Sequence, residues 1–320
     1  MTSCLAVLKA GLQTTVQDLG RWGFQARGVP VAGAMDWRSH RLANALAGND
    51  RQAATLEIVL TGPELEFEDA RIVAVAGAGF ELTVDGSAVG MHAPFAVGRG
   101  SRVKFGARLR GARAYLAIAG GIAVPEVLGS RATHLRSRMG GLEGRALVAG
   151  DRVPLGPLVR LKPDSTYEPD ISGSRGVRLQ PDWSPLTLRV LPGPQLDKFA
   201  DEALEVLQSG PYTVQSESDR MGFRLAGPRV AHRQGADIIS DATPIGALQV
   251  PASGQPLLLM ADRPTTGGYP KIAIVVTADM PIAAQLAPGD TVAFAACTPQ
   301  EALAALVALE RPLLALEGRA

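Results

Sequence analysis

The sequence predicts a mainly β protein with a few short helices, divided into two domains. Glycine and proline are abundant, at 36 and 23 of 320 residues, and both break long regular elements. Helical periodicity is confined to a few segments. Apolar, strand-like runs recur at short intervals, at residues 72–75, 80–84, 115–118, 186–191, 257–261 and 272–276. These observations favour compact barrels or sandwiches over a doubly wound sheet, and the length suffices for two hydrophobic cores.

The composition is that of a globular protein without a strongly charged surface. Hydrophobic residues make up 46% of the chain, charged residues 20%, and the formal net charge is +1. Nucleic-acid backbones and anionic membranes are bound through concentrated positive charge, which this balance does not supply. The sequence therefore predicts neither a nucleic-acid nor a membrane partner.

Signals for targeting and for metal binding are not found in the sequence. The N-terminus lacks a basic region followed by a long apolar stretch, and no apolar run reaches the roughly 18 residues needed to span a bilayer. Cys4 and Cys297 stand near opposite ends, and the four histidines are scattered without metal-ligand spacing. We therefore expect a cytoplasmic protein without a metal site.

Composition and weak internal similarity predict the domain boundaries. An Arg-x-Gly-Phe motif occurs at residues 21–24 and again at 220–223, which suggests a duplicated unit. Between the two halves, a stretch rich in Pro, Ser, Gly and Asp is typical of a linker. The predicted division is residues 1–155 for the first β unit, 156–185 for the linker, 186–297 for the second β unit and 298–320 for a C-terminal helix and tail.

Three helices are predicted from capping residues and apolar periodicity. Asp36 is a suitable N-cap for a helix over residues 37–47, and Gly48 is the expected terminating residue. Apolar residues spaced by three and four predict a second helix at residues 195–207. Thr298 and Glu301 form a capping box for a third helix, which we expect to end at about residue 309.

Glu57 interrupts an apolar, strand-like run and allows two interpretations. Alternation of side chains along a strand would turn it toward solvent. Alternatively, it is a buried carboxyl group, which would need a hydrogen-bonding or charged partner. The sequence leaves both interpretations open.

The most polar loop of the chain joins the apolar runs 257–261 and 272–276. One interpretation is a solvated hairpin in which Gly267 and Gly268 make the turn. The other is the wall of a ligand site, because the loop combines an acid, two cations and three hydroxyl groups. Its polar and turn-forming residues are Asp262, Arg263, Thr265, Thr266, Gly267, Gly268, Tyr269 and Lys271. A glycine-rich loop that ends at the Asp36 helix start could likewise hold an anion on free backbone N–H groups.

Two common catalytic motifs do not occur. The chain has no GxxxxGK[ST] phosphate-binding loop and no GxSxG nucleophile motif. A P-loop nucleotide site and a serine-hydrolase triad therefore have no support in the sequence.

Six blocks of sequence are informative as an ordered set. They are TTVQDLGRWGFQARGVPVAGAMD, TLEIVLTGPELEF, YLAIAGGIAVPEVLGS, LPGPQ, SESDRMGFRL and ADRPTTGGYPKIAIV, and they span about residues 5–295. In this order they resemble the KipA-type family, also called the biotin-dependent carboxyltransferase or allophanate hydrolase subunit two family. The greatest similarity is to the group of 5-oxoprolinase C subunits. Two positions depart from the family pattern: Pro264 replaces a usual Gln, and Ala132 replaces a hydroxyl residue.

The resemblance implies a fold, an activity and partners. The fold would consist of two cyclophilin-like β-barrel units in a pseudo-repeat. The activity would be that of a hydrolase: an ATP-dependent 5-oxoprolinase that converts 5-oxo-L-proline to L-glutamate. The chain would act in a complex with two partners, a KipI-like B subunit and a separate A subunit. ATP would be the co-substrate of that complex.

Two alternatives follow from the same resemblance. The chain could be the carboxyltransferase component of a biotin-dependent urea or amide carboxylase. Biotin would then be carried by a partner, because the sequence has no AMKM attachment motif. It could also be a non-enzymatic regulator that binds a KipI-like protein.

The matching blocks supply the candidate site residues. Lys271 and Arg220 are predicted to neutralise charge during catalysis, and Asp262 to position a water molecule or a base. Both departures, Pro264 and Ala132, remove a hydrogen-bonding side chain from this region. The predicted substrate-binding residues are Arg21, Pro30, Asp36, Asp219, Gln249, Thr265, Thr266, Gly267, Gly268 and Tyr269.

Overall fold

The computed structural model describes residues 3–158 and 186–318, which fold into two compact units. The first unit comprises residues 3–21, 36–158 and 311–318. The second unit comprises residues 22–35 and 186–310. Strands predominate in both units, which confirms the mainly β class.

The units differ from the predicted domains in two places. Residues 22–35 belong to the second unit although they precede most of the first, and residues 311–318 return to the first unit. The reason is that packing, rather than order in the chain, defines a compact unit. The linker predicted at residues 156–185 lies outside the described residues except for its first three positions.

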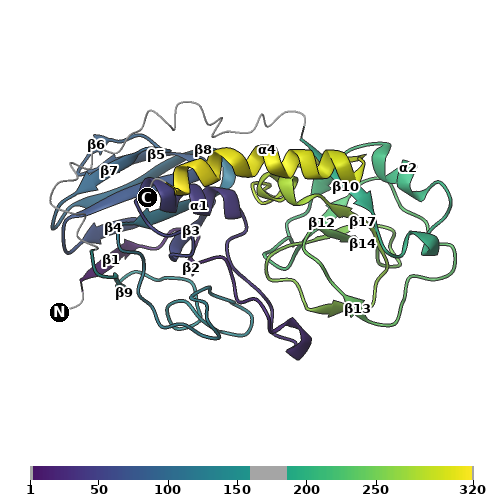
Figure 1. The fold of residues 1–320 in the computed structure, drawn as a ribbon, viewed down its shortest axis with the longest axis horizontal. Helices are drawn as coiled ribbons and strands as arrows, with labels where there is room; N and C mark the ends of the chain where they lie inside the picture. Colours follow the sequence, from purple (N-terminus) through teal and green to yellow (C-terminus); the bar gives the residue numbers. More distant parts are fainter. Residues whose placement is uncertain (1–2, 159–185, 319–320) are drawn as a thin grey trace. The chain divides into compact units, whose positions relative to one another are not determined.

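Nine antiparallel strands form the sheet of the first unit. Hydrogen-bonded neighbours follow the order β2-β3-β8-β4-β1-β9, and β5 pairs with β6, β7 and β8. β5 and β8 run side by side over most of their length (Figure 1), and register shifts between Gly77 and Leu82 mark bulges that bend the pair. The strands are β1 (Cys4–Lys9), β2 (Gln13–Gln17), β3 (Thr55–Val59), β4 (Glu64–Phe67), β5 (Arg71–Val84), β6 (Ser87–Ala88), β7 (Pro94–Val97), β8 (Arg102–Ile118) and β9 (Arg152–Pro154).

Alternating side chains place one face of these strands in the core. In β4, Leu65 and Phe67 are fully buried, whereas Glu64 and Glu66, which alternate with them, are half-buried. The predicted runs 72–75 and 80–84 are two parts of the single strand β5. They join because the bulges let one long strand bend without ending.

The helix predicted after Asp36 is confirmed as α1 (Trp37–Leu46). The Asp36 carboxylate accepts hydrogen bonds from the Ser39 backbone N–H (2.9 Å) and from the Ser39 hydroxyl (2.6 Å). Gly48 follows the helix with φ +73°, a conformation that favours glycine. α1 packs against β5 and β8 and buries the polar side chains of His40 and Asn44.

Glu57 is a buried carboxyl group with a partner, so its interpretation as a solvent-facing residue is wrong. The side chain is 0% exposed, and the Tyr115 hydroxyl donates to its Oε2 at 2.7 Å. That same hydroxyl oxygen accepts the backbone N–H of Asp36 at 2.8 Å. Tyr115 therefore connects β3 and β8 to the start of α1. The two hydrogen bonds also satisfy its hydroxyl group, since a buried polar group without a partner would be destabilising.

The second unit is built on a closed seven-stranded barrel, in the order β10-β17-β14-β15-β12-β11-β18. A parallel pairing of β10 with β18 closes the ring, and the other pairings are antiparallel. A separate two-stranded sheet pairs β13 (Asp241–Ala242) with β16 (Thr266–Gly267). The barrel strands are β10 (Thr187–Pro192), β11 (Tyr212–Val214), β12 (Gly222–Ala226), β14 (Ala247–Gln249), β15 (Leu257–Leu259), β17 (Lys271–Val275) and β18 (Thr291–Ala296).

Short helices complete the second unit. They are η1 (Gln25–Arg27), η3 (Leu196–Lys198), α2 (Ala203–Gln208), η4 (Thr277–Asp279) and α3 (Met280–Ala283). The continuous helix predicted over residues 195–207 is therefore wrong. The chain breaks at Phe199, which is extended, 1% exposed and bridged to His232. Burying this aromatic ring in the barrel core outweighs the local helical pattern.

The C-terminal helix α4 (Pro299–Glu317) begins as predicted but is longer. The Thr298 hydroxyl accepts the Glu301 backbone N–H (3.2 Å), and the Glu301 carboxylate accepts the Thr298 N–H (2.7 Å), which is a capping box. The helix continues to Glu317, which binds the Arg41 guanidinium through two hydrogen bonds. This buried pair explains the extra turns.

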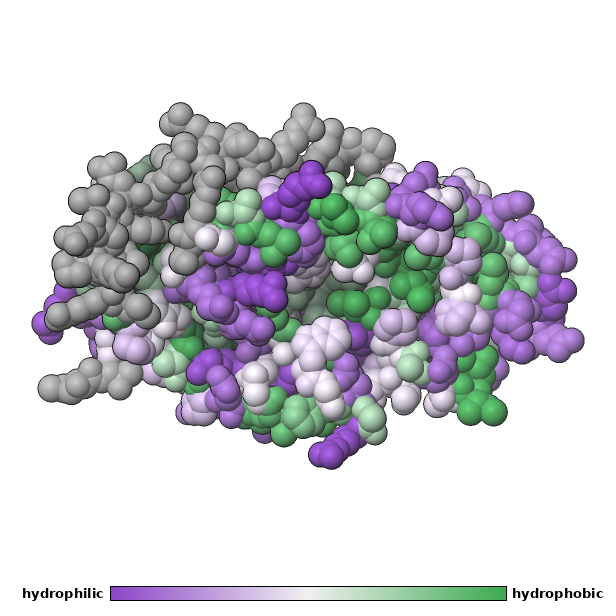
Figure 2. Space-filling view, viewed as in Figure 1, coloured by the Kyte–Doolittle hydropathy of each residue, from purple (hydrophilic) through white to green (hydrophobic). Residues whose placement is uncertain are grey.

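One face of α4 is apolar and exposed. Leu303, Val307 and Leu314 are 62%, 47% and 50% exposed, and Figure 2 shows apolar residues gathered over the region of this helix. Within residues 3–158 and 186–318, no helix combines the length and the apolar character needed to cross a membrane.

His40 lies in the buried polar layer beneath α1. Its Nε2 lies 3.1 Å from the carbonyl oxygen of Arg51 and 3.3 Å from the Asn44 amide nitrogen. Nδ1 lies 2.9 Å from the Thr55 hydroxyl. Burial lowers the pKa of His40 from 6.5 to about 4, although Asp18 opposes this shift.

We predict that His40 makes the protein less stable in mild acid. Between pH 6.5 and about 4 the unfolded chain binds a proton that folded His40 does not, so stability is full above pH 6.5 and falls as the pH drops. Replacing His40 by Gln should reduce the loss of unfolding free energy across this window by on the order of 3 kcal/mol. Urea unfolding at a series of pH values measures it.

His92 provides a second, independent test of the same effect. Burial also lowers its pKa to about 4, so His92→Gln should remove a separate and additive part of the same pH dependence. An unchanged pH dependence in His40→Gln would contradict the prediction.

Candidate functional site

The polar loop between β15 and β17 is not a hairpin, so that interpretation is wrong. β15 and β17 each pair with β14, which lies between them in the barrel. Within the loop, Asp262 and Arg263 are buried, and β16 pairs with β13. Pairing between strands distant in sequence thus folds the loop back onto the barrel.

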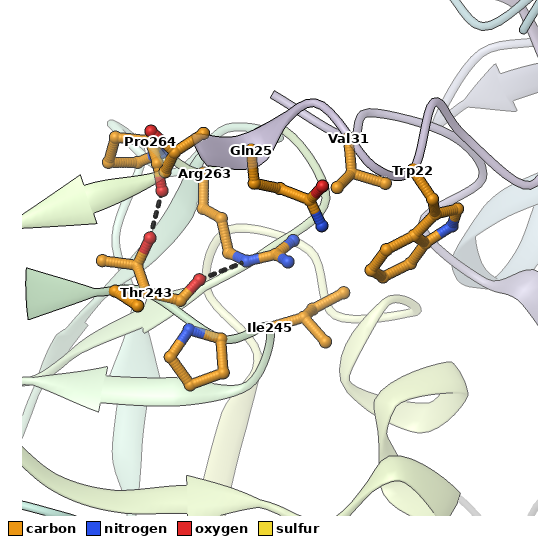
Figure 3. A pocket seen from close by; sticks show the side chains of 10 residues that line it. Trp22, Gln25, Val31, Thr243, Ile245, Arg263 and Pro264 are labelled. Atoms are coloured by element: carbon orange, nitrogen blue, oxygen red, sulfur yellow. Dashed lines mark hydrogen bonds between the residues drawn. The ribbon is translucent and has the colours of Figure 1, made fainter. Parts of the chain in front are cut away.

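A cavity of about 470 Å³ opens beside this loop, entirely within the second unit. Figure 3 shows the Arg263 side chain extending into it, between Gln25 and Ile245, with Trp22 beyond. The walls come from the segment around η1, from residues that follow β13 and from the polar loop. The lining residues are Trp22, Gln25, Val31, Ala242, Thr243, Pro244, Ile245, Arg263, Pro264 and Thr265. We call this cavity the Arg263 pocket.

Arg263 is a buried cation held by neutral groups. Its Nε donates to the carbonyl oxygen of Thr243 at 2.8 Å, and Nη1 to that of Met260 at 3.3 Å. Burial lowers the pKa of Arg263 to about 10, with Asp262 opposing the shift, so the group is still charged near neutral pH. Among the described residues, no ion pair neutralises it directly.

The predicted catalytic residues Arg220 and Asp262 are brought together, but as an ion pair. Two hydrogen bonds join them, Nε to Oδ2 at 3.0 Å and Nη2 to Oδ1 at 2.9 Å, and both side chains are 5% exposed. Arg220 Nη2 also donates to the carbonyl oxygen of Gly33 at 2.6 Å. The pair thus fixes the polar loop to the segment 22–35, and both charges are used in this contact.

Lys271, the third predicted catalytic residue, is also paired. Its Nζ lies 3.0 Å from Asp241 Oδ2, and its side chain is 1% exposed against 49% for Asp241. Gln195 donates to the same oxygen at 2.9 Å. The hydrogen bond from Lys271 is the main reason that the pKa of Asp241 is lowered. Lys271 therefore fastens β13, which leads directly into the pocket wall at Ala242 and Thr243.

Polar contacts within the loop hold the remaining wall in place. The Thr243 hydroxyl donates to the carbonyl oxygen of Pro264, and the Gln249 amide donates to that of Tyr269 at 3.2 Å. A Cβ on Gly267 would come within 2.6 Å of the Gln249 amide nitrogen, so any other residue would displace the Gln249 side chain. These contacts make the loop a shaped wall rather than a mobile connector.

Of the other predicted substrate-binding residues in the second unit, only Thr265 lines the pocket. Thr266 is exposed in β16, Gly268 accepts the Ile238 N–H through its carbonyl oxygen, and Tyr269 is 40% exposed. Asp219 is exposed and caps its own turn by accepting the Met221 N–H at 2.8 Å. Pro30 is half-buried next to the lining residue Val31.

Arg21 and Asp36 have structural contacts in the first unit. Arg21 is fully buried, and its guanidinium donates to the carbonyl oxygens of Val127 (3.4 Å) and Ala132. The Asp36 carboxylate caps α1 as described above. These bonds give Asp36 a capping role and anchor part of the Arg21 guanidinium, whose buried Nη1 has no hydrogen-bond partner among the described residues.

Sequence reasoning missed most of the pocket. Arg263 is adjacent in sequence to the predicted residue Asp262. Its position in the ADRPTTGGYP block was the sequence feature that could have identified it as a site residue. Trp22 and Gln25 lie in the first matching block. Thr243 and Ile245 carry no sequence signal, because they reach the pocket through strand pairing. Within the described part of the chain, no group of His, Cys, Asp and Glu side chains could hold a metal ion.

We predict that Arg220 and Asp262 stabilise the fold as a unit. Arg220→Met should lower the unfolding free energy by about 3–5 kcal/mol, because it leaves the Asp262 carboxylate buried without its guanidinium partner. The double variant Arg220→Met/Asp262→Leu should lose clearly less than the sum of the single variants. Chemical denaturation of the three variants gives the coupling energy.

An exposed ion pair offers the matched control. Arg233 and Asp201 are 51% and 89% exposed, so Arg233→Met should change stability by less than about 1 kcal/mol. Additive losses in the Arg220 and Asp262 variants would show that the two side chains act independently, contrary to the prediction.

Comparison with known proteins identifies close relatives. Residues 27–296 match the family described as "Carboxyltransferase domain, subdomain A and B". The chain is 40% identical over 301 residues to the C subunit of the 5-oxoprolinase of Escherichia coli (strain K12), covering 94% of each chain. It is 34% identical over 303 residues to the urea amidolyase of Lachancea kluyveri, covering 90% of this chain but 16% of that protein.

A solved structure agrees with the sequence relatives. The crystal structure of the K. lactis urea amidolyase superposes with a TM-score of 0.89 at 31% identity, over 98% of this chain and 20% of that one. The chain thus corresponds to a small part of urea amidolyase and to nearly the whole of the 5-oxoprolinase C subunit. As the ordered blocks predicted, the chain belongs to the carboxyltransferase domain family with subdomains A and B.

Proposed function

We propose that the chain is a subunit of the 5-oxoprolinase complex that converts 5-oxo-L-proline to L-glutamate with hydrolysis of ATP. The observation that carries this proposal is the match to a 5-oxoprolinase C subunit over 94% of both chains. The similarity therefore extends over nearly all of that relative. The match to urea amidolyase, in contrast, covers 16% of the relative.

The proposed reaction requires activation of a stable amide. Phosphoryl transfer from ATP to the lactam oxygen would make the carbonyl carbon more electrophilic. A first water molecule then adds to that carbon, the ring C–N bond breaks and the nitrogen takes up a proton, which leaves an acyl phosphate. A second water molecule hydrolyses the acyl phosphate to the carboxylate of glutamate and inorganic phosphate. The Arg263 pocket offers a buried cation that can hold the negative charge of such a substrate.

The residues of the Arg263 pocket do not fit ATP. A triphosphate needs several cations or a metal ion, and the pocket is lined by a single charged side chain. We therefore assign ATP binding to another part of the complex. The proposed partners are the KipI-like B subunit with the A subunit, and the cytoplasm is the proposed location.

A carboxyltransferase activity is the second candidate, favoured by the 31% identity to a urea amidolyase of known structure. Biotin would be a guest on a partner chain. Its uncharged ureido ring is compatible with the apolar walls and the single guanidinium of the pocket, which could donate to the ureido oxygen. When bound, biotin would supply the carboxyl group to be transferred.

Reconstitution tests the proposed function. We expect glutamate to form from 5-oxo-L-proline and ATP when this chain is combined with its A and B partners, and formation to fall to background when any one is omitted. Consumption of carboxybiotin in the presence of urea would instead favour the second candidate. Full turnover without this chain, with complex formation retained, would support the regulatory alternative and contradict the proposal.

A further inference from the structure

The charge of Arg263 has no carboxylate of its own within the pocket. Of the lining residues it is the only charged one, and Asp262 beside it in sequence is already bound twice by Arg220. Carbonyl oxygens of Thr243 and Met260 orient the guanidinium but carry no net charge. A cation kept buried in this way is suited to a ligand that brings the missing negative charge.

The guanidinium presents unused donors toward the cavity. An arginine side chain has five N–H donors, and the two carbonyl oxygens engage Nε and Nη1. Figure 3 shows the end of the group facing the space between Gln25 and Ile245. Two parallel N–H donors match the two oxygens of a carboxylate, which is the strongest form of this contact.

The rest of the pocket is suited to a small flat apolar body. Val31, Pro244 and Ile245 form apolar walls, and Trp22 places an indole ring, 60% exposed, at the far side of the cavity. Gln25 uses its side-chain oxygen to accept the Gly23 N–H at 2.9 Å, which leaves its NH₂ group as a donor for a ligand carbonyl. A volume of about 470 Å³ is within the usual range for small-molecule sites.

We infer that the Arg263 pocket binds a small ring-borne monocarboxylate, with its carboxylate on Arg263 and its ring between Ile245 and Trp22. This inference rests on the proposed function, which makes 5-oxo-L-proline the natural ligand: the lactam carbonyl oxygen would accept from Gln25. A single guanidinium balances one carboxylate and leaves the flat lactam ring on apolar walls. Arg263 is then the anchor of the substrate, and Asp262, Arg220 and Lys271 are positioning residues that hold the walls.

Calorimetric titration of the 320-residue chain with four small ligands tests the inference. We expect 5-oxo-L-proline to bind about 10–100-fold more tightly than 2-pyrrolidinone, which has the same ring without the carboxylate, because a charge-assisted hydrogen-bonded pair is lost. Inorganic phosphate and bicarbonate should bind more weakly than 5-oxo-L-proline, because they lack the ring. Equal affinity for the two lactams, or tighter binding of either inorganic anion, would overturn the inference.

Variants of arginine residues make the test specific to the site. Arg263→Gln should weaken 5-oxo-L-proline binding about 10–100-fold and leave 2-pyrrolidinone binding unchanged, whereas Arg263→Lys should recover part of the difference. Arg229→Gln is the matched control, since Arg229 also donates to a carbonyl oxygen, that of Ser253, but is exposed and does not line the pocket. Thermal melts identify any loss of folding.

Turnover in the reconstituted complex separates failure of the inference from failure of the proposed function. Turnover of 5-oxo-L-proline with an unchanged KM in Arg263→Gln would refute the binding site and leave the function standing. Arg263-dependent binding by the chain without turnover in any complex would refute the function and leave the site standing. A raised KM, with kcat changed less, would support both.

Discussion

The Arg263 pocket depends on the buried ion pair between Arg220 and Asp262. Two hydrogen bonds join a turn before β12 to the loop after β15, and a third, from Arg220 to the Gly33 carbonyl oxygen, attaches the segment that carries Trp22 and Gln25. Both carboxylate oxygens of Asp262 accept hydrogen bonds from Arg220, and the charge of Asp262 only partly offsets the effect of burial on Arg263. The same contact therefore holds two walls of the pocket together and occupies the carboxylate that is adjacent to Arg263 in sequence.

Signals that act over a few residues were readable from the sequence. Asp36 caps α1, Gly48 ends it, and Thr298 with Glu301 begins α4, because capping depends on neighbouring backbone groups. Pairing between distant strands was not readable. The apolar runs around the polar loop allowed a hairpin as one interpretation, but β14 lies between β15 and β17, and nothing local to the loop encodes that position.

In the candidate site, the roles of the charged residues were likewise not predictable from the sequence. The sequence marked Arg220, Asp262 and Lys271 as polar residues in an informative block, yet their roles depend on partners 42 and 30 positions away. Each of the three is paired with an oppositely charged side chain, while Arg263, which was not among the candidate site residues, extends into the cavity without an ion-pair partner among the described residues. Whether a charged side chain stabilises the fold or remains available to a ligand depends on its partner in three dimensions. Composition and residue spacing do not reveal that partner.

The segment of residues 22–35 has a consequence for how this protein can be divided. The chain leaves the first unit after Arg21, contributes one wall of the pocket to the second unit, and returns at Asp36 to begin α1. A fragment with every barrel strand, cut from residue 186 onward, would lack Trp22, Gln25 and the Gly33 carbonyl that Arg220 binds. The barrel strands and one wall of the Arg263 pocket thus come from separate stretches of the chain, so a contiguous piece that contains only the barrel strands lacks part of the pocket.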